Sequence, residues 1–259
     1  MALNTRDEFD LTGKICLITG GSRGMGREMA HAFARHGADI IIVSRKLDNC
    51  EEVAKEICEQ HGRKAWAYAC HVGSWTQIGE LVERVYSEIG RVDVLVNNAG
   101  MSPLYESLES ITEEMYDKVM GVNLKGPFRL ATLIGSRMAR GDGGSIINVS
   151  SCGAVIPSAH ELPYSNAKAG LHNLSTGLAR GLGPKVRSNV IMPGPFLTDI
   201  SKAWDMQAML AHAEKEIPLR RLAEPNEIVG AALLLASNAS SYISGAVIKV
   251  DGGLLYSAS

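Results

Sequence analysis

Short apolar runs alternate with longer segments of helical periodicity along the whole chain. Several apolar runs lack the polar–apolar alternation of a half-exposed strand, which is typical of strands covered on both faces. These runs predict seven strands, at about 15–19, 40–43, 65–70, 92–96, 145–149, 187–191 and 247–250. The segments between them predict helices at about 24–36, 48–61, 75–89, 112–139, 163–182 and 225–237.

This order of elements predicts an α/β protein with a doubly wound, seven-stranded parallel sheet and helices on both faces. No linker-like stretch or internal repeat interrupts the pattern, so we expect a single domain over residues 1–259. The segment at about 195–215 departs from the rhythm. It is either a surface helical excursion or a substrate lid, since doubly wound sheets bind ligands beyond the carboxyl ends of their strands.

Composition narrows the function classes. The 259 residues carry a net charge of −2, which offers no general attraction to nucleic acid or an acidic membrane. The longest apolar runs are far shorter than the ~20 residues of a membrane-spanning helix, and the amino terminus is polar. Five scattered cysteines suit a reducing compartment. We therefore expect a soluble, cytoplasmic protein without a metal site.

A glycine-rich turn connects the first predicted strand to the first predicted helix. Glycine lets the backbone turn tightly and approach a pyrophosphate, which the free N–H groups of a helix start can hold. The pattern predicts a dinucleotide-binding loop. The residues expected to contact the cofactor here are Gly20, Ser22, Arg23, Gly24, Met25 and Gly26.

The second predicted strand ends in Ser44, Arg45 and Lys46. An acidic residue at this place would bind the ribose 2′-hydroxyl of the cofactor and repel a 2′-phosphate, whereas a guanidinium suits a phosphate. Together with Arg23 in the glycine loop, this favours NADP(H) over NAD(H). The alternative is that Arg45 and Lys46 only begin a solvated turn.

Tyr164 and Lys168 stand four residues apart on a predicted helix and therefore share one face. A free phenol has a pKa of about 10, and a nearby ammonium lowers it toward the range where acid–base catalysis is effective. Ser151 follows the fifth predicted strand, and Asn98–Gly100 follow the fourth. Because the carboxyl ends of parallel strands meet at one edge, we expect these groups to line one crevice.

In this order, the motifs resemble those of the short-chain dehydrogenases/reductases over about residues 11–253. The matching pieces are Thr19–Gly26, Asn97–Gly100, Asn123, Ser151, Tyr164 with Lys168, Pro193–Gly194 with Thr198, and Asp251–Gly253. The resemblance implies a single-domain Rossmann fold and hydride transfer between a nicotinamide cofactor and a ketone or secondary alcohol. The 3-oxoacyl-thioester reductase and carbonyl reductase branch is the most similar.

The resemblance also implies residue roles. Tyr164 would be the acid–base, Ser151 would orient the substrate oxygen, and Lys168 would lower the tyrosine pKa and bind the nicotinamide ribose. Asn123 would support a bound water next to Lys168. Further cofactor contacts would come from Val72, Asn98, Ala99, Gly100, Pro193, Gly194 and Thr198. His71 stands where the family usually has an aspartate near the adenine, so it is included as a contact of altered chemistry.

The substrate is expected to be a neutral or hydrophobic carbonyl compound, because the residues around the crevice carry few charges. The expected substrate contacts are Ser151, Cys152, His160, Pro195 and Trp204. The enzymatic alternative is an NAD-dependent alcohol or sugar dehydrogenase. A non-catalytic, cofactor-sensing protein is the alternative of another class, and the presence of both Tyr164 and Lys168 argues against it.

The resemblance further implies a homotetramer, assembled through the long helices at 112–139 and 163–182 and through the last helix and strand. In the last helix an apolar face for a partner is offered by Val229, Ala232, Leu233 and Ala236. The remaining histidines of the first two helices, His31, His36 and His61, are expected to be solvated.

Overall fold

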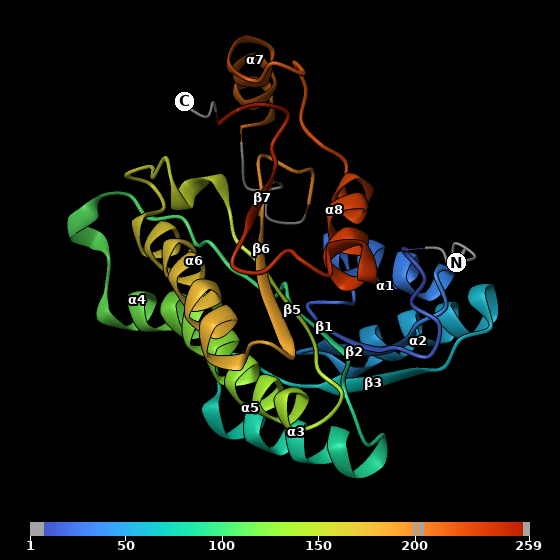
Figure 1. Ribbon diagram of the computed structural model, residues 1–259. Coiled ribbons are helices and arrows are strands. Elements are labelled where there is room, and N and C mark those ends of the chain that lie inside the picture. The colour runs from blue at the N-terminus through green and yellow to red at the C-terminus, as the bar shows by residue number, and fades with distance from the viewer. Residues whose placement is uncertain (1–7, 199–200, 202–204, 256–259) are drawn as a thin grey trace.

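The seven predicted strands form one parallel sheet (Figure 1). The computed structural model describes residues 8–198, 201 and 205–255, so Trp204 lies outside the described residues. The strands are β1 (Ile15–Thr19), β2 (Asp39–Ser44), β3 (Ala65–Ala69), β4 (Val94–Asn97), β5 (Gly144–Val149), β6 (Val186–Pro193) and β7 (Val247–Val250). Their spatial order is β3-β2-β1-β4-β5-β6-β7, which confirms the predicted fold class. The order reverses between β1 and β4, the point where such sheets bind ligands.

Helices cover both faces of the sheet (Figure 1). One layer consists of α1 (Gly24–Arg35), α2 (Leu47–His61) and α8 (Val229–Ala236). The other consists of α3 (Trp75–Glu88), α5 (Gly126–Arg140) and α6 (Leu162–Leu182). In β1, Ile18 packs into the first layer and the adjacent Leu17 into the second. Burial on both faces explains why β1, β2, β4 and β5 lack polar–apolar alternation.

The predicted helix at 112–139 is divided in the structure. Helix α4 (Glu113–Met120) passes through a π-helical turn (Gly121–Lys125) into α5. A β-carbon added to Gly126 would collide with the Val72 carbonyl, so the second segment approaches the chain after β3 too closely for a side chain. The helix predicted at 112–139 is therefore present, and the π-helical turn inside it was not predicted. The last predicted helix likewise begins as a short 3-10 turn (Pro225–Ile228) before α8.

Within the segment at 195–215, the structure describes α7 (Met206–Glu216). Only Ala213 of this helix is buried, and Met206 and Leu210 are exposed apolar residues. No helix in the described parts of the chain has the length and apolar character needed to span a bilayer.

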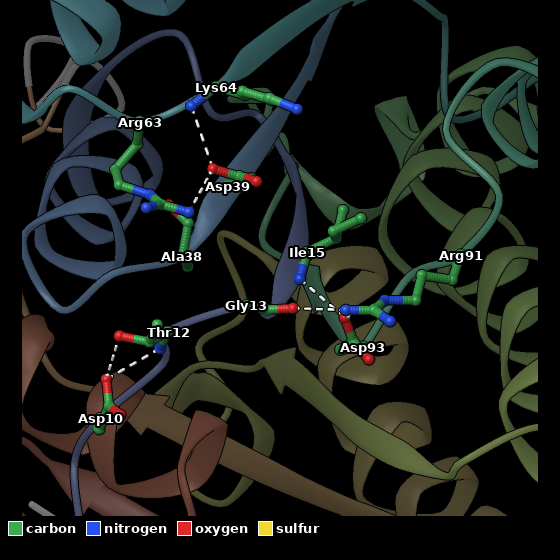
Figure 2. Close-up of polar contacts among 10 residues, drawn as sticks. All are labelled: Asp10, Thr12, Gly13, Ile15, Ala38, Asp39, Arg63, Lys64, Arg91 and Asp93. Carbon is green, nitrogen blue, oxygen red and sulfur yellow. Dashed lines mark hydrogen bonds and ion pairs between the residues drawn. The ribbon is translucent and has the colours of Figure 1, made fainter.

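The amino ends of the strands are joined by charged contacts (Figure 2). Asp93 accepts a hydrogen bond from the Ile15 N–H (2.8 Å) and pairs with Arg91 (3.1 Å). Asp39 pairs with Arg63 (2.7 Å) and accepts from the Lys64 N–H (3.0 Å). Because all seven strands are parallel, the predicted site residues lie at the opposite, carboxyl edge.

Two expectations about burial were wrong. His31 is 6% exposed, because it lies between α1 and α2 and finds polar partners there. Its Nδ1 is 3.0 Å from His61 Nε2, and its Nε2 is 3.1 Å from Glu56 Oε2. The apolar face of α8 that was expected to contact a partner packs instead into the chain's own core. Ala232, Leu233 and Ala236 are buried there, and Val229 is partly buried against the same core.

Candidate functional site

The glycine loop forms a tight cradle at the carboxyl end of β1. Gly20 (φ 65°) and Gly24 (φ 52°) adopt left-handed backbone conformations that favour glycine. A β-carbon added to Gly26 would collide with the Gly20 carbonyl, so the turn closes only without a side chain there. Arg23 precedes α1 and gives its first turn no side-chain cap. This combination fits the diphosphate of a dinucleotide.

The chain after β4 is fastened to this loop. The Asn98 amide donates hydrogen bonds to the carbonyls of Thr19 (3.0 Å) and Gly20 (3.3 Å). The N–H groups of Asn98 and Ala99 both donate to Thr19 Oγ1. Asn98, expected as a cofactor contact, thus uses its side chain to hold the glycine loop in place.

At the end of β2, Arg45 and Lys46 are exposed, and no acidic side chain of the described residues forms an ion pair with either. Ser44 is partly buried and contacts Cys50 Sγ (3.0 Å). After β3, Val72 is buried, and Nδ1 of the preceding His71 accepts a hydrogen bond from the Gly73 N–H (3.2 Å). One imidazole nitrogen of His71 is therefore already engaged locally.

Tyr164 lies in the first turn of α6 and contacts the turn that follows β5. The Ser151 hydroxyl forms a hydrogen bond with the phenol, which lowers its pKa. Burial has the larger and opposite effect, and the negative charge of Glu161 adds to it, so the pKa of Tyr164 is raised overall. In the chain alone, the expected lowering of the tyrosine pKa by Lys168 does not appear.

Lys168 is buried beside this tyrosine, as the four-residue spacing indicated. Its Nζ lies 5.5 Å from the centroid of the Tyr164 ring and donates to the Val149 carbonyl (2.7 Å). Burial lowers the pKa of Lys168 to about 8, because an ammonium loses its hydration there.

Asn123 occupies the π-helical turn and is fully buried. Its amide donates to the carbonyls of Met101 (2.8 Å) and Val119 (2.9 Å), and its Oδ1 accepts from the Met101 N–H (3.1 Å). A β-carbon on Gly100 would lie 3.0 Å from Asn123 Oδ1 and 3.5 Å from Lys168 Nζ. Asn123 and Lys168 therefore approach each other at Gly100.

The residues expected at the nicotinamide end also gather at the carboxyl edge. Pro193 is the last residue of β6, and a β-carbon on the next residue, Gly194, would lie 2.9 Å from the Asp251 Cα. Thr198 reaches the glycine loop, since its methyl carbon lies 3.8 Å from a β-carbon built on Gly24.

The residues expected to contact the substrate differ in how buried they are and in where they lie. Cys152 is partly buried, and burial raises the pKa of its thiol. His160 is exposed in the loop before α6. Pro195 lines a cavity of about 140 Å³ together with Ile217 and Val250. Trp204 is outside the described residues.

The sequence analysis assigned no role to several residues of the site. Ser150 is buried, donates to the Lys168 carbonyl (3.0 Å) and lies 2.8 Å from His172 Nε2, which ties β5 to α6. Tyr105 and Glu161 lie with Tyr164 in one shallow pocket. Glu161 could have been predicted to lie near Tyr164, because it stands three residues before it. No local sequence pattern indicates that Tyr105 belongs to the site.

The fold and this arrangement define a doubly wound α/β protein with a dinucleotide-type glycine loop and a Ser–Tyr–Lys group at the carboxyl edge. Residues 20–255 match the family model described as enoyl-(acyl carrier protein) reductase. The chain belongs to the short-chain dehydrogenase/reductase family, whose members are oxidoreductases that use nicotinamide cofactors.

Its relatives act on different substrates. The chain is 37% identical to a 3-oxoacyl-(acyl-carrier-protein) reductase of Thermotoga maritima, over 95% of this chain and 99% of that one. It is 35% identical to a D-threitol dehydrogenase of Mycolicibacterium smegmatis, over 95% and 94%. The structure of L-sorbose reductase from Gluconobacter frateurii, complexed with NADPH and L-sorbose, superposes with a TM-score of 0.90 at 30% identity, over 97% and 100%.

Proposed function

We propose that this protein is an NADP(H)-dependent oxidoreductase that interconverts a ketone and a secondary alcohol. The observation that carries the proposal is the contact between the Ser151 hydroxyl and the Tyr164 phenol, with buried Lys168 on the same helix face. These groups lie at the sheet edge that also holds the glycine loop. This arrangement supports a mechanism in which a proton donor and a hydrogen-bonding hydroxyl act on one substrate oxygen.

In reduction, Tyr164 Oη would donate its proton to the carbonyl oxygen, and in oxidation it would take the proton from the alcohol. Ser151 Oγ would hold the same oxygen through a hydrogen bond, so negative charge on it is always supported. Lys168 Nζ, with a pKa near 8, would favour the phenolate when a proton is removed. When bound, the cofactor would supply or accept the hydride.

The glycine cradle around Gly26 supports a dinucleotide, and the cations at the end of β2 support the phosphorylated form. Arg45 and Lys46 would contact the 2′-phosphate, and Arg23 would approach it from the glycine loop. Asn123, held between the Met101 backbone and α4, would support a water beside Lys168.

Tyr164→Phe tests the assignment, because it removes the proton and keeps the ring. Turnover of ketones with NADPH should fall by about three orders of magnitude or more, within the range that acid–base catalysis contributes to rate. Cofactor binding, followed by fluorescence titration, should change little. Tyr242→Phe is the matched control, since Tyr242 is fully exposed. A Tyr164→Phe variant with near wild-type kcat would overturn the proposal.

An NAD-dependent alcohol or sugar dehydrogenase is the second candidate, favoured by the similarity to D-threitol dehydrogenase. The ratio of kcat/KM with NADPH to that with NADH separates the two. A ratio above one supports the first candidate, and a ratio below one supports the second.

We also propose that the chain acts as one domain with a lid at about 195–215. The exposed apolar residues Met206 and Leu210 on α7 support a helix that closes over substrate. Hydrogen exchange in α7 should slow when cofactor and a substrate analogue are both bound. Equal exchange with and without them would make α7 an ordinary surface helix.

A homotetramer is proposed from the exposed apolar residues on the faces that the family resemblance assigns to assembly. Phe128 on α5 is exposed, and so is Val247 in β7. Light scattering at micromolar concentration should give four times the chain mass. A monomer would contradict the proposal.

A further inference from the structure

Glu161 is an acidic residue at the site that the proposed mechanism does not use. It is the residue just before α6 and stands three positions before Tyr164. Its Oε1 would lie 2.5 Å from a β-carbon built on Gly153, in the turn that follows Ser151. The carboxylate therefore lies between the two backbone segments that carry Ser151 and Tyr164.

This carboxylate acts electrostatically on the site. Burial is the main cause that raises the pKa values of the Tyr164 phenol and the Cys152 thiol, and the negative charge of Glu161 raises both further. Glu161 also lines the same shallow pocket as Tyr164 and Tyr105. Glu161 and Tyr164 thus line one pocket, and the charge of the carboxylate acts on the phenol.

The protein's own groups use only part of the hydrogen-bonding capacity of the Glu161 carboxylate. The Ser165 hydroxyl donates a hydrogen bond to Oε1 (3.3 Å), and among the described residues no lysine, arginine or histidine forms an ion pair with the carboxylate. Burial without a cation raises the pKa of Glu161. An ionised carboxylate has about four acceptor positions, so most of its capacity is left for another donor.

A capping role does not account for Glu161. Acidic residues are often found before a helix because their oxygens accept from its first N–H groups. Glu161 makes no such bond to α6. The first N–H, that of Leu162, donates instead to the Tyr105 hydroxyl at 2.8 Å.

We propose that Glu161 is a specificity residue. The substrate carries a hydrogen-bond donor, a hydroxyl or an ammonium group, on the carbon next to the carbonyl or alcohol carbon that reacts. This inference rests on the proposed function and names the substrate class. A donor on the substrate supplies the partner that the carboxylate lacks. A ketone flanked only by methylene groups, as in a 3-oxoacyl thioester, leaves the partly buried charge unpaired and is disfavoured.

Matched ketones of equal size test the preference. Hydroxyacetone and aminoacetone are compared with butanone, and 2-hydroxycyclohexanone with 2-methylcyclohexanone, by kcat/KM with NADPH and with NADH. In the wild type the donor-bearing member should be favoured about tenfold or more, the size of one charge-assisted hydrogen bond. The hydroxyl and ammonium arms show which donor the site prefers.

Glu161→Leu should bring the ratio within each pair close to one. Glu161→Gln keeps an acceptor oxygen and should retain part of the hydroxyl preference while losing the ammonium preference. Glu109→Gln removes an exposed carboxylate outside the site and should leave every ratio unchanged. If the Leu variant does not fold, as judged by circular dichroism, the kcat/KM ratios of the Gln variant are compared with those of the wild type instead.

Two failures are distinguishable. If both members of a pair are reduced with equal kcat/KM by the wild type, or if the ratio survives in both Glu161 variants, the role of Glu161 is wrong and the proposed function stands. If no ketone is reduced with either cofactor, the proposed function itself fails, and the role of Glu161 fails with it.

Discussion

The Tyr105 hydroxyl accepts a hydrogen bond from the Leu162 N–H at 2.8 Å, across 57 positions of the chain. The same hydroxyl donates to the Ala159 carbonyl at 2.6 Å. Leu162 is the first residue of α6, and its N–H is one of the amides that a helix leaves unsatisfied at its start. A phenol from the loop after β4 therefore caps the helix that carries Tyr164 and Lys168.

Tyr105→Phe should destabilise the protein and weaken catalysis. It removes the oxygen that joins the two backbone groups. Because this contact lies near the surface, water can replace the oxygen in part, and the cost is about 0.5–1.5 kcal/mol. For a chain of this length the melting temperature should fall by roughly 1–6 °C. The start of α6 loosens, so kcat should fall more than KM rises. Tyr116→Phe, an exposed tyrosine on α4, is the control. An unchanged melting temperature would show that the cap contributes nothing.

The strands and the Tyr164–Lys168 pair were predictable because both depend on short-range pattern. A strand buried on both faces must be apolar throughout, and β1 and β2 consist of such runs. Residues four apart share a helix face wherever a helix forms, and Lys168 indeed lies beside the Tyr164 ring. These features need no knowledge of distant segments.

What escaped prediction depends on contacts between distant segments. The π-helical turn at Asn123 hardly alters the apolar pattern of 112–139, and the close approach of Gly126 to Val72 lies just after it. His31 is buried because α2 brings Glu56 and His61 against it. Neither follows from a local window of sequence.

Arg45→Asp should weaken NADPH binding and change NADH binding little. The variant places a carboxylate where a 2′-phosphate would bind, and a lost charge-assisted contact changes affinity by about tenfold or more. The Kd values of both cofactors, measured by fluorescence titration, check this. Arg180→Asp, an exposed change near the end of α6, should leave both unchanged. A parallel loss for NADPH and NADH would contradict a contact specific to the 2′-phosphate.

Asp93→Ala should destabilise the fold without changing the candidate site at the carboxyl edge of the sheet. Asp93 is 9% exposed, and its loss leaves the Ile15 N–H at the start of β1 without its acceptor (Figure 2). An unsatisfied buried donor costs about 1–3 kcal/mol. Urea unfolding should show this loss, while Asp93→Asn, which keeps an oxygen, should lose less. Asp142→Ala, in an exposed loop, is the control. Equal stability of the Ala variant and the wild type would refute the role of Asp93.

Lys168 should make the stability of the protein rise with pH above about 8. Burial lowers the pKa of its ammonium from 10.5 to about 8 in the folded chain. Between these two values the unfolded chain still binds the proton that the folded chain has released. The free energy of unfolding therefore increases with pH in this window, and below it the folded state bears the full cost of a buried charge.

Lys168→Met removes this titration. The free energy of unfolding of the wild type, measured relative to the Met variant by urea titration, should increase from pH 7.5 to pH 10. The control is Lys118→Met, since Lys118 is exposed on α4. The difference in the free energy of unfolding between the wild type and this variant should not change with pH. If the difference between the wild type and Lys168→Met stays constant over this range, Lys168 titrates at the same pH in both states. The ammonium would then be fully charged at neutral pH and would not lose its proton near pH 8.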